Sequence, residues 1–226
     1  MSDQALGLYG QQARKQQQRS VVTQDKLLDA ATEAFSENGF KGTSTREIAD
    51  RAGVHHPLIT YHFKNKEQLW RSATDRIFRE FNRALARGIA DIPASEPRKR
   101  AETFIRTYVR YAHRQPALHK IILQESSYPS ERLEWLIERH LKPLCDESVR
   151  YLKELQGIGI AQPGNPALLF NMIRVSAGGL LALSLEIKGT SAIDFDSDGA
   201  LNELSDMIIQ CFLGGKSTDN PIRAGS

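Results

Sequence analysis

Residues 43–69 read TSTREIADRAGVHHPLITYHFKNKEQL, and this stretch predicts the fold of the N-terminal part of the chain. It opens with Thr43 to Thr45, whose side-chain oxygens can cap a helix. A short apolar face follows, so we expect a helix of about two turns that ends at Gly53. After a tight turn, Ile59 and Phe63 are spaced to form the buried face of a second short helix. Two short helices joined by a glycine turn form the helix-turn-helix layout.

A proline and three histidines lie around the second helix. Pro57 fits its first turn, where backbone N–H groups have no partner within the helix. We expect the helix to begin near His55, which places residues 55–58 at the end that enters the major groove of DNA in this layout. His55, His56 and His62 do not predict a metal site, because adjacent side chains diverge on a helix and no carboxylate or cysteine stands at ligand spacing.

The positive charge of the chain is concentrated in the same region. The 226 residues carry 30 Lys and Arg against 27 Asp and Glu, a formal net charge of +3 at pH 7. Residues 41–66 alone hold five basic and two acidic side chains, which matches the excess of the whole chain. A cationic face suits DNA, because release of counterions from the phosphates supplies most non-specific affinity.

The whole sequence predicts an all-α protein. Apolar residues recur at helical spacing in 23–38, 66–90, 98–114, 116–126, 130–155, 166–187 and 200–213, and no run alternates like a strand between hairpin turns. The expected organisation is a disordered, basic and Gln-rich arm at 1–20, then a helix-turn-helix domain at 21–66 with its motif at about 44–63. A connecting helix at 66–90 leads to a helical domain at 98–213.

Several other classes of protein are not indicated. Cys145 and Cys211 stand far apart, which predicts two reduced, buried thiols and neither a disulfide nor a zinc site. We expect a cytoplasmic protein without a membrane span, because no stretch is long and apolar enough and the N-terminus lacks the apolar run of a signal peptide. No cofactor is expected, and G-x-S-x-G, H-E-x-x-H and P-loop sequences are absent. An all-α ligand carrier or enzyme is the competing class.

The opening stretch resembles the N-terminal domain of the TetR/AcrR family of bacterial transcriptional regulators. The resemblance lies in TSTREIADRAGV, in the YHF that ends the second helix and in the KNKEQL that opens the next one. The preceding helix, with its A-x-x-x-F-x-x-x-G-F ending, is similar too. The motif covers roughly residues 21–70 and implies a ligand-responsive DNA-binding regulator, most often a repressor released from a palindromic operator by a small molecule. An activator or dual regulator of the same fold is the alternative.

The resemblance implies DNA contacts for eleven side chains: Thr45, Arg46, His55, His56, Pro57, Leu58, Thr60, Tyr61, His62, Lys64 and Lys66. Thr45 would contact phosphate, and the residues at 56–58 would read bases. Arg46 can reach a guanine, the commonest specific contact of arginine. Thr60 stands where most members carry tyrosine, so Tyr61 can take over that phosphate contact. His55 replaces the usual serine-like cap. Residues 14–19 hold three basic side chains, which form either a minor-groove arm or a solvated tail.

Beyond residue 70 the resemblance is one of architecture only, and it implies a domain that binds a small molecule and forms a homodimer through its last two helices, 166–187 and 200–213. The small residues of SAGGLLALSLE, 176–186, suit a close contact between subunits, and packing within one chain is the alternative. His140 lies in register with an apolar stripe, so it contacts either a ligand or a buried neighbour. The candidate pocket residues are Tyr108, His119, Trp135, His140, Phe170 and Arg174.

Overall fold

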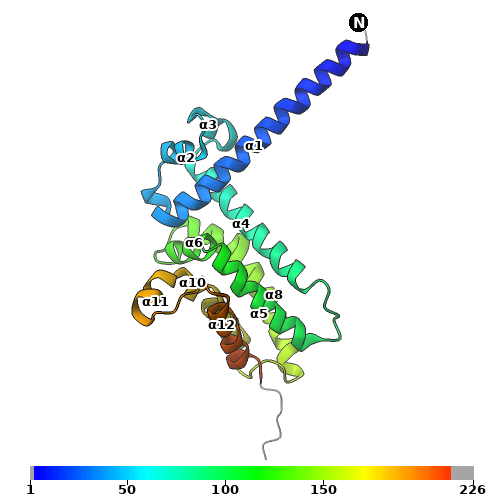
Figure 1. The fold of residues 1–226 in the computed structure, drawn as a ribbon, viewed down its shortest axis with the longest axis vertical. Helices are drawn as coiled ribbons and strands as arrows, with labels where there is room; N and C mark the ends of the chain where they lie inside the picture. Colours follow the sequence, from blue (N-terminus) through cyan, green and yellow to red (C-terminus); the bar gives the residue numbers. More distant parts are fainter. Residues whose placement is uncertain (1–2, 215–226) are drawn as a thin grey trace, which may run out of the picture. The chain divides into compact units, whose positions relative to one another are not determined.

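The computed structural model describes residues 3–214, which are helical apart from short connections and one isolated antiparallel bridge between Ala161 and Leu213 (Figure 1). The expected all-α fold is confirmed. The chain divides into two compact units, one that ends at Glu80 and one that begins at Phe81. Each unit has its own buried apolar side chains, as an independent core requires.

The N-terminal unit contains α1 (Asp3–Gly42), α2 (Thr45–Ala52), α3 (Pro57–Phe63) and the first part of α4 (Lys66–Ile89). Its core is built from apolar residues that recur at helical spacing in the sequence, and the largest fully buried side chains are Leu27, Phe35, Ile48, Ile59, Leu69 and Trp70. Asn65 caps α4, because its Oδ1 accepts a hydrogen bond from the backbone N–H of Gln68 at 2.8 Å.

The start of the chain differs from the expectation. We expected disorder at residues 1–20, whereas α1 begins at Asp3 and runs without a break into the part of the helix that is packed from Leu27 onward. Gln, Lys and Arg have good helix propensity, so they extend a helix whose later turns are held by packing. The expected stop at Gly39 is present as a kink, where the backbone adopts φ 68° and ψ 174°.

The C-terminal unit follows α4 with α5 (Pro97–Arg114), α6 (Ala117–Glu125), α7 (Glu131–Leu136) and α8 (Lys142–Gly157). A Gly- and Pro-rich connection leads to α9 (Pro166–Arg174), α10 (Leu180–Ala182), α11 (Ser184–Ser191) and α12 (Asp198–Phe212). Within this unit α12 packs on α5, and α8 packs on α9. In Figure 1, α5, α8 and α12 lie together in this unit.

Two helices that the sequence predicts as continuous are interrupted. In 130–155 a π-helical turn, η1 (Ile137–Leu141), separates α7 from α8, just before Pro143, which cannot donate a backbone hydrogen bond. In 166–187 a second π-helical turn, η2 (Val175–Gly179), follows α9, and the chain bends by 77° between α10 and α11. No single described helix is long and apolar enough to cross a membrane; only the bent pair 166–182 and 184–191 reaches the required length and composition.

The two thiols are also more accessible than expected. Both cysteines are free, but Cys145 is half-buried and Cys211 is exposed. Cys211 lies one turn after Met207, which is 57% exposed, so it stands on the outer side of α12 and not with the buried Leu204 and Ile208.

Candidate functional site

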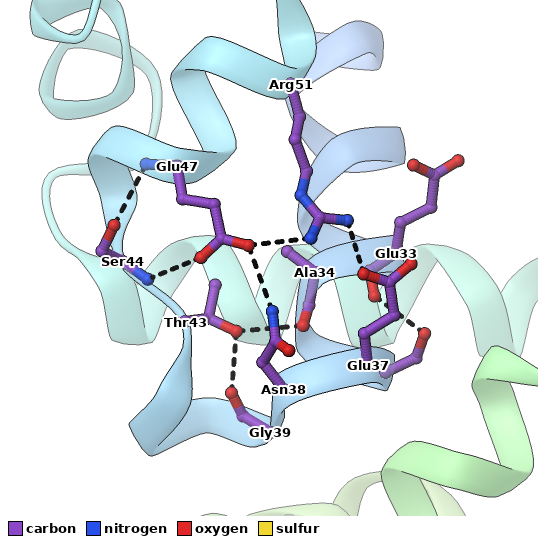
Figure 2. A network of polar contacts seen from close by, with 10 residues as sticks. Glu33, Ala34, Glu37, Asn38, Gly39, Thr43, Ser44, Glu47 and Arg51 are labelled. Atoms are coloured by element: carbon purple, nitrogen blue, oxygen red, sulfur yellow. Dashed lines mark hydrogen bonds and ion pairs between the residues drawn. The ribbon is translucent and has the colours of Figure 1, made fainter.

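Helix α2 begins with a capping box. The Oγ atom of Ser44 accepts a hydrogen bond from the backbone N–H of Glu47 at 3.0 Å, and the Glu47 carboxylate accepts one from the Ser44 N–H at 3.5 Å (Figure 2). At the other end Gly53 adopts a left-handed conformation with φ 64°, which a residue with a side chain rarely takes. These two devices fix where α2 starts and where the turn to α3 begins.

A polar network joins α2 to the end of α1. Arg51 donates to Glu37 at 2.7 Å and to Glu47 at 2.8 Å, and Asn38 donates to the same Glu47 at 3.1 Å (Figure 2). The hydroxyl of Thr43 donates to backbone carbonyls of α1. Arg51 is therefore neutralised by two carboxylates within the protein, and this part of the local positive charge does not face a phosphate.

Helix α3 begins at Pro57, two residues later than expected. His56 is the N-cap residue, has helical φ and ψ, and makes no capping hydrogen bond with its side chain. Ile59 and Phe63 are buried as the spacing predicts. The Nε2 atom of His56 instead lies 2.9 Å from the hydroxyl oxygen of Thr45, the first residue of α2. The structure thus joins an expected base-reading residue to an expected phosphate contact.

The eleven expected contact residues differ in exposure. Those whose side chains are exposed are Arg46, His55, His56, Pro57, Thr60, Tyr61 and Lys64, while Thr45, Leu58, His62 and Lys66 are half-buried. Tyr61 is 75% exposed, so it is available to a partner in place of the missing tyrosine at position 60. Burial lowers the pKa of His62, which favours its neutral form. The Nζ atom of Lys66 lies 4.4 Å from the centre of the Phe40 ring, a cation–π contact.

The C-terminal unit contains a cavity of about 530 Å³ between side chains of α4, α5, α8 and α9, with Leu213 added from the end of α12. Its lining is mostly apolar, and the polar lining residues are Asn82, Arg100, Tyr108, Glu147, Ser148 and Tyr151. Among the six candidate pocket residues, the structure places Tyr108 and Phe170 in this lining. It does not place His119, Trp135, His140 or Arg174 there.

His119 is a buried neighbour of the cavity wall. Its Nε2 atom lies 2.9 Å from the hydroxyl of Tyr108, and only 3% of the residue is exposed. Burial, followed by the positive charge of Arg174, lowers the pKa of His119 to about 4. A Cβ atom at Gly178 in η2 would stand 2.0 Å from Nε2 of His119, so this glycine makes room for the ring. His140 contacts the ring of Trp135, with centroids 5.3 Å apart.

Arg100 and Tyr151 are lining residues that the sequence did not single out. Tyr151 belongs to the apolar stripe of α8, and that register is the signal by which it could have been found. Arg100 has no such signal, because its place depends on the end of α4, where its guanidinium donates to the carbonyl oxygens of Ile89 and Ile92. Within the described residues no group of three His, Cys, Asp or Glu side chains could hold a metal ion.

Residues 27–73 match the family described as bacterial regulatory proteins, tetR family. This segment of the chain is therefore a TetR-type N-terminal domain. The matched segment begins in the packed part of α1, includes α2 and α3, and ends in α4, so the resemblance seen in the sequence is confirmed. The chain accordingly has an N-terminal helix-turn-helix domain of this family, followed by a helical C-terminal unit.

Similarity to known proteins extends beyond that segment, although the chain spans only about half the length of some of the curated relatives that it matches. The chain is 26% identical over 121 residues to the "Probable HTH-type transcriptional regulator YttP" of Bacillus subtilis, a match that spans 54% of this chain and 58% of that protein. It is 27% identical over 162 residues to the HTH-type transcriptional repressor NicS of Pseudomonas putida, covering 72% and 71% of the two chains. A structure of AibR in complex with isovaleryl coenzyme A and operator DNA matches with a TM-score of 0.66 at 17% identity, over 83% of this chain and 96% of that one. At that identity the likeness concerns the fold.

Proposed function

We propose that this protein is a transcriptional regulator of the TetR family: a dimeric repressor that binds a palindromic operator and leaves it when a small molecule occupies the cavity of the C-terminal unit. The observation that carries the proposal is the exposed leading end of α3, which is held to α2 by the 2.9 Å contact between Thr45 and His56. In helix-turn-helix proteins this end meets the base edges of the major groove. NicS is named a repressor, which favours repression over activation.

The proposed contacts follow from exposure and chemistry. Arg46 is exposed and can bond a guanine with two N–H groups, while Leu58 has no polar atom and suits a thymine methyl group. His56 can donate or accept, according to its tautomer, and Pro57 adds shape. Thr45, Thr60 or Tyr61, His62, Lys64 and Lys66 would contact phosphates, which position the protein without reading sequence.

The proposed dimer contact uses two helices that leave apolar side chains exposed. Leu168 and Met172 on α9 are 64% and 55% exposed, and Met207 on α12 is 57% exposed. The helices α9 and α12 are neighbours within the unit. Exposed apolar surface of this kind can mark interaction sites. A two-fold dimer would present two α3 helices to major-groove faces about 34–36 Å apart.

Release by a ligand follows from linkage between the cavity and α4. Residues 81–89 of this helix line the cavity, and its first turns belong to the N-terminal unit. A ligand that binds better to a form with the wrong separation of the two α3 helices lowers the affinity for DNA by the same factor. AibR was crystallised with both a small molecule and operator DNA, which supports a protein of this fold that binds both kinds of ligand. We accordingly propose a binding protein of the cytoplasm, without catalysis or cofactor.

Selection of bound DNA from a random pool tests the proposal. We expect the wild-type chain to enrich a palindrome with half-sites about one helical turn apart or a multiple of it. Replacing residues 56–58 together should change the enriched sequence while the circular dichroism of the protein stays that of a folded helical chain. A matched control replaces three exposed residues of the C-terminal unit, Glu138, Asp146 and Arg150, and should leave the enriched sequence unchanged. If the variant at 56–58 enriched the wild-type palindrome, base reading would lie elsewhere.

A further inference from the structure

The cavity of the C-terminal unit is lined along two helices. Its lining residues follow α8 from Leu144 to Leu155 and follow α5 from Arg100 to Tyr108. At a helical rise of about 1.5 Å per residue, the lining stretch of α8 is about 16 Å long. Most of this length is lined by aliphatic and aromatic side chains, so a ligand that fills it must be mostly apolar.

Arg100 supplies a fixed positive charge to this apolar lining. Its guanidinium is half-buried and is held by two backbone carbonyls at the end of α4, those of Ile89 and Ile92. A guanidinium has five N–H donors, and both of these hydrogen bonds use one nitrogen, Nη1. Within the described part of the chain no carboxylate lies at ion-pair distance from Arg100.

Tyr151 lines the same cavity and is within reach of this charge. Burial raises the pKa of its hydroxyl, the positive charge of Arg100 lowers it, and the negative charge of Glu154 raises it by a smaller amount. The neutral hydroxyl can donate a hydrogen bond to an acceptor in the cavity. The other lining tyrosine, Tyr108, already contacts His119 and so has less capacity for a ligand. The acidic lining residue, Glu147, is exposed, so solvent screens its charge far more than that of Arg100.

We propose that the cavity takes an elongated, mainly apolar molecule that ends in an anionic head group, with the head at Arg100 and Tyr151 and the apolar part directed along α8 toward Leu144. A planar guanidinium binds carboxylate or phosphate through parallel hydrogen bonds, which are stronger than neutral ones. This inference rests on the proposed role of the cavity as the effector site, and it adds the chemical class of the effector.

Three probes with the same ten-carbon chain separate the charge from the apolar part: decanoate, 1-decanol and decylammonium. Their binding to the full-length protein is measured by calorimetry below the concentrations at which they form micelles. We expect decanoate to bind at least tenfold more tightly than decanol, and decylammonium more weakly than either. Equal affinity for decanoate and decanol, or a preference for decylammonium, overturns the proposal. This comparison needs no variant, so it stands even where a substitution in the cavity unfolds the chain.

Two variants then locate the head group and the chain. Arg100→Gln should lower the affinity for decanoate about tenfold or more and leave that for decanol nearly unchanged. The matched control is Lys99→Gln, which removes the same charge from the neighbouring residue, whose side chain is 62% exposed and outside the lining. Ala86→Trp, which adds bulk to the wall from an exposed position, should weaken both probes. Retention of the decanoate preference in Arg100→Gln would place the head elsewhere and overturn the assignment.

DNA selection and decanoate binding test the proposed function and the proposed ligand class separately. The palindrome is selected without any ligand, so a chain that enriches a palindrome but shows no decanoate preference remains a regulator with a different class of effector. A chain that prefers decanoate through Arg100 and binds no DNA keeps the inferred ligand class and loses the proposed function.

Discussion

The hydroxyl oxygen of Thr45 and the Nε2 atom of His56 lie 2.9 Å apart, across the turn between α2 and α3. This contact links the first residue of one helix to the residue before the other. The contact also links the two expected DNA contacts of these residues. The direction in which the Thr45 hydroxyl donates its hydrogen decides which tautomer His56 adopts toward a base. If Thr45 donates to His56, the exposed Nδ1 atom carries a proton and donates; if His56 donates, Nδ1 accepts.

Removing the hydroxyl of Thr45 should lower both the affinity for DNA and the discrimination between bases. Thr45→Val keeps the shape of the side chain but removes the bond to His56 and the expected phosphate contact, so we expect the affinity for the selected operator to fall about tenfold. Discrimination at the base facing His56 should fall as well, because either tautomer becomes available. Operator titrations with single base changes measure both effects. Thr190→Val, the same change on exposed α11, should alter neither, and a Thr45→Val protein with wild-type affinity would remove Thr45 from the interface.

Lys66 should contribute to affinity without contributing to specificity. Lys66→Ala removes a charge expected to face a phosphate, so binding should weaken by a similar factor for all sequences, and the slope of log K against log salt should fall by about 1. The lost contact with Phe40 should cost about 1 kcal/mol of stability at most. Lys142→Ala on α8 is the matched change in the other unit. A changed order of preferred bases in Lys66→Ala would contradict the backbone role.

The proposed dimer should form through α9 and α12. Met172→Glu introduces a charge on the exposed apolar face and should yield a monomer in sedimentation at micromolar concentration, whereas Tyr128→Glu, at a loop residue that is 79% exposed, should not. Replacing Gly179 by a bulky residue should also disrupt the dimer, since overpacking costs about 1–3 kcal/mol.

The exposed thiol of Cys211 gives a second readout of this dimer. It lies one turn from Met207 on α12, so a thiol reagent should modify it slowly in the wild type and quickly in the Met172→Glu monomer. A wild-type chain that sediments as a monomer would contradict the predicted interface.

Gly178 should be intolerant of any side chain. An added Cβ atom would stand 2.0 Å from Nε2 of His119, inside the buried contact with Tyr108, so Gly178→Ala should destabilise the fold by about 1–3 kcal/mol. Gly189→Ala, in a helix where no atom lies within 4 Å of the new Cβ, should be neutral or stabilising by up to about 1 kcal/mol. Urea unfolding compares the two, and equal stabilities would show that η2 shifts to accommodate the methyl group.

The buried His119 should make the protein less stable in mild acid. Its pKa is lowered from 6.5 to about 4, so between these values the unfolded chain binds a proton that the folded chain does not. The free energy of unfolding therefore falls as the pH drops through this window, by up to about 3 kcal/mol for this group. His119→Gln keeps a polar partner for Tyr108 but does not titrate, and it should flatten the dependence of stability on pH. His113→Gln, at a half-buried ring 3.8 Å from Asp196, is the matched control.

The local features of the N-terminal unit follow from the sequence because each has a local cause. Cap oxygens at 43–45, a glycine at 53, a proline at 57 and a cap at Asn65 act within one helical turn, and the structure contains a helix boundary at each. Apolar spacing placed Ile59 and Phe63 in the core correctly for the same reason. The start of α3 was placed two residues early, since His55 and His56 have no strong preference and the proline is what fixes the first turn.

Features that depend on contacts between residues distant in the sequence could not be predicted from local sequence patterns. The pairing of Thr45 with His56, the neutralisation of Arg51 by Glu37, and the position of Arg100 against the end of α4 join side chains that no periodicity relates. The π-helical turns and the 77° bend lie within stretches whose apolar spacing is helical throughout, so a sequence pattern does not reveal them. Short-range hydrogen bonding and spacing fixed the helices, whereas the packing of one helix on another fixed the cavity and the place of Arg100 in its lining.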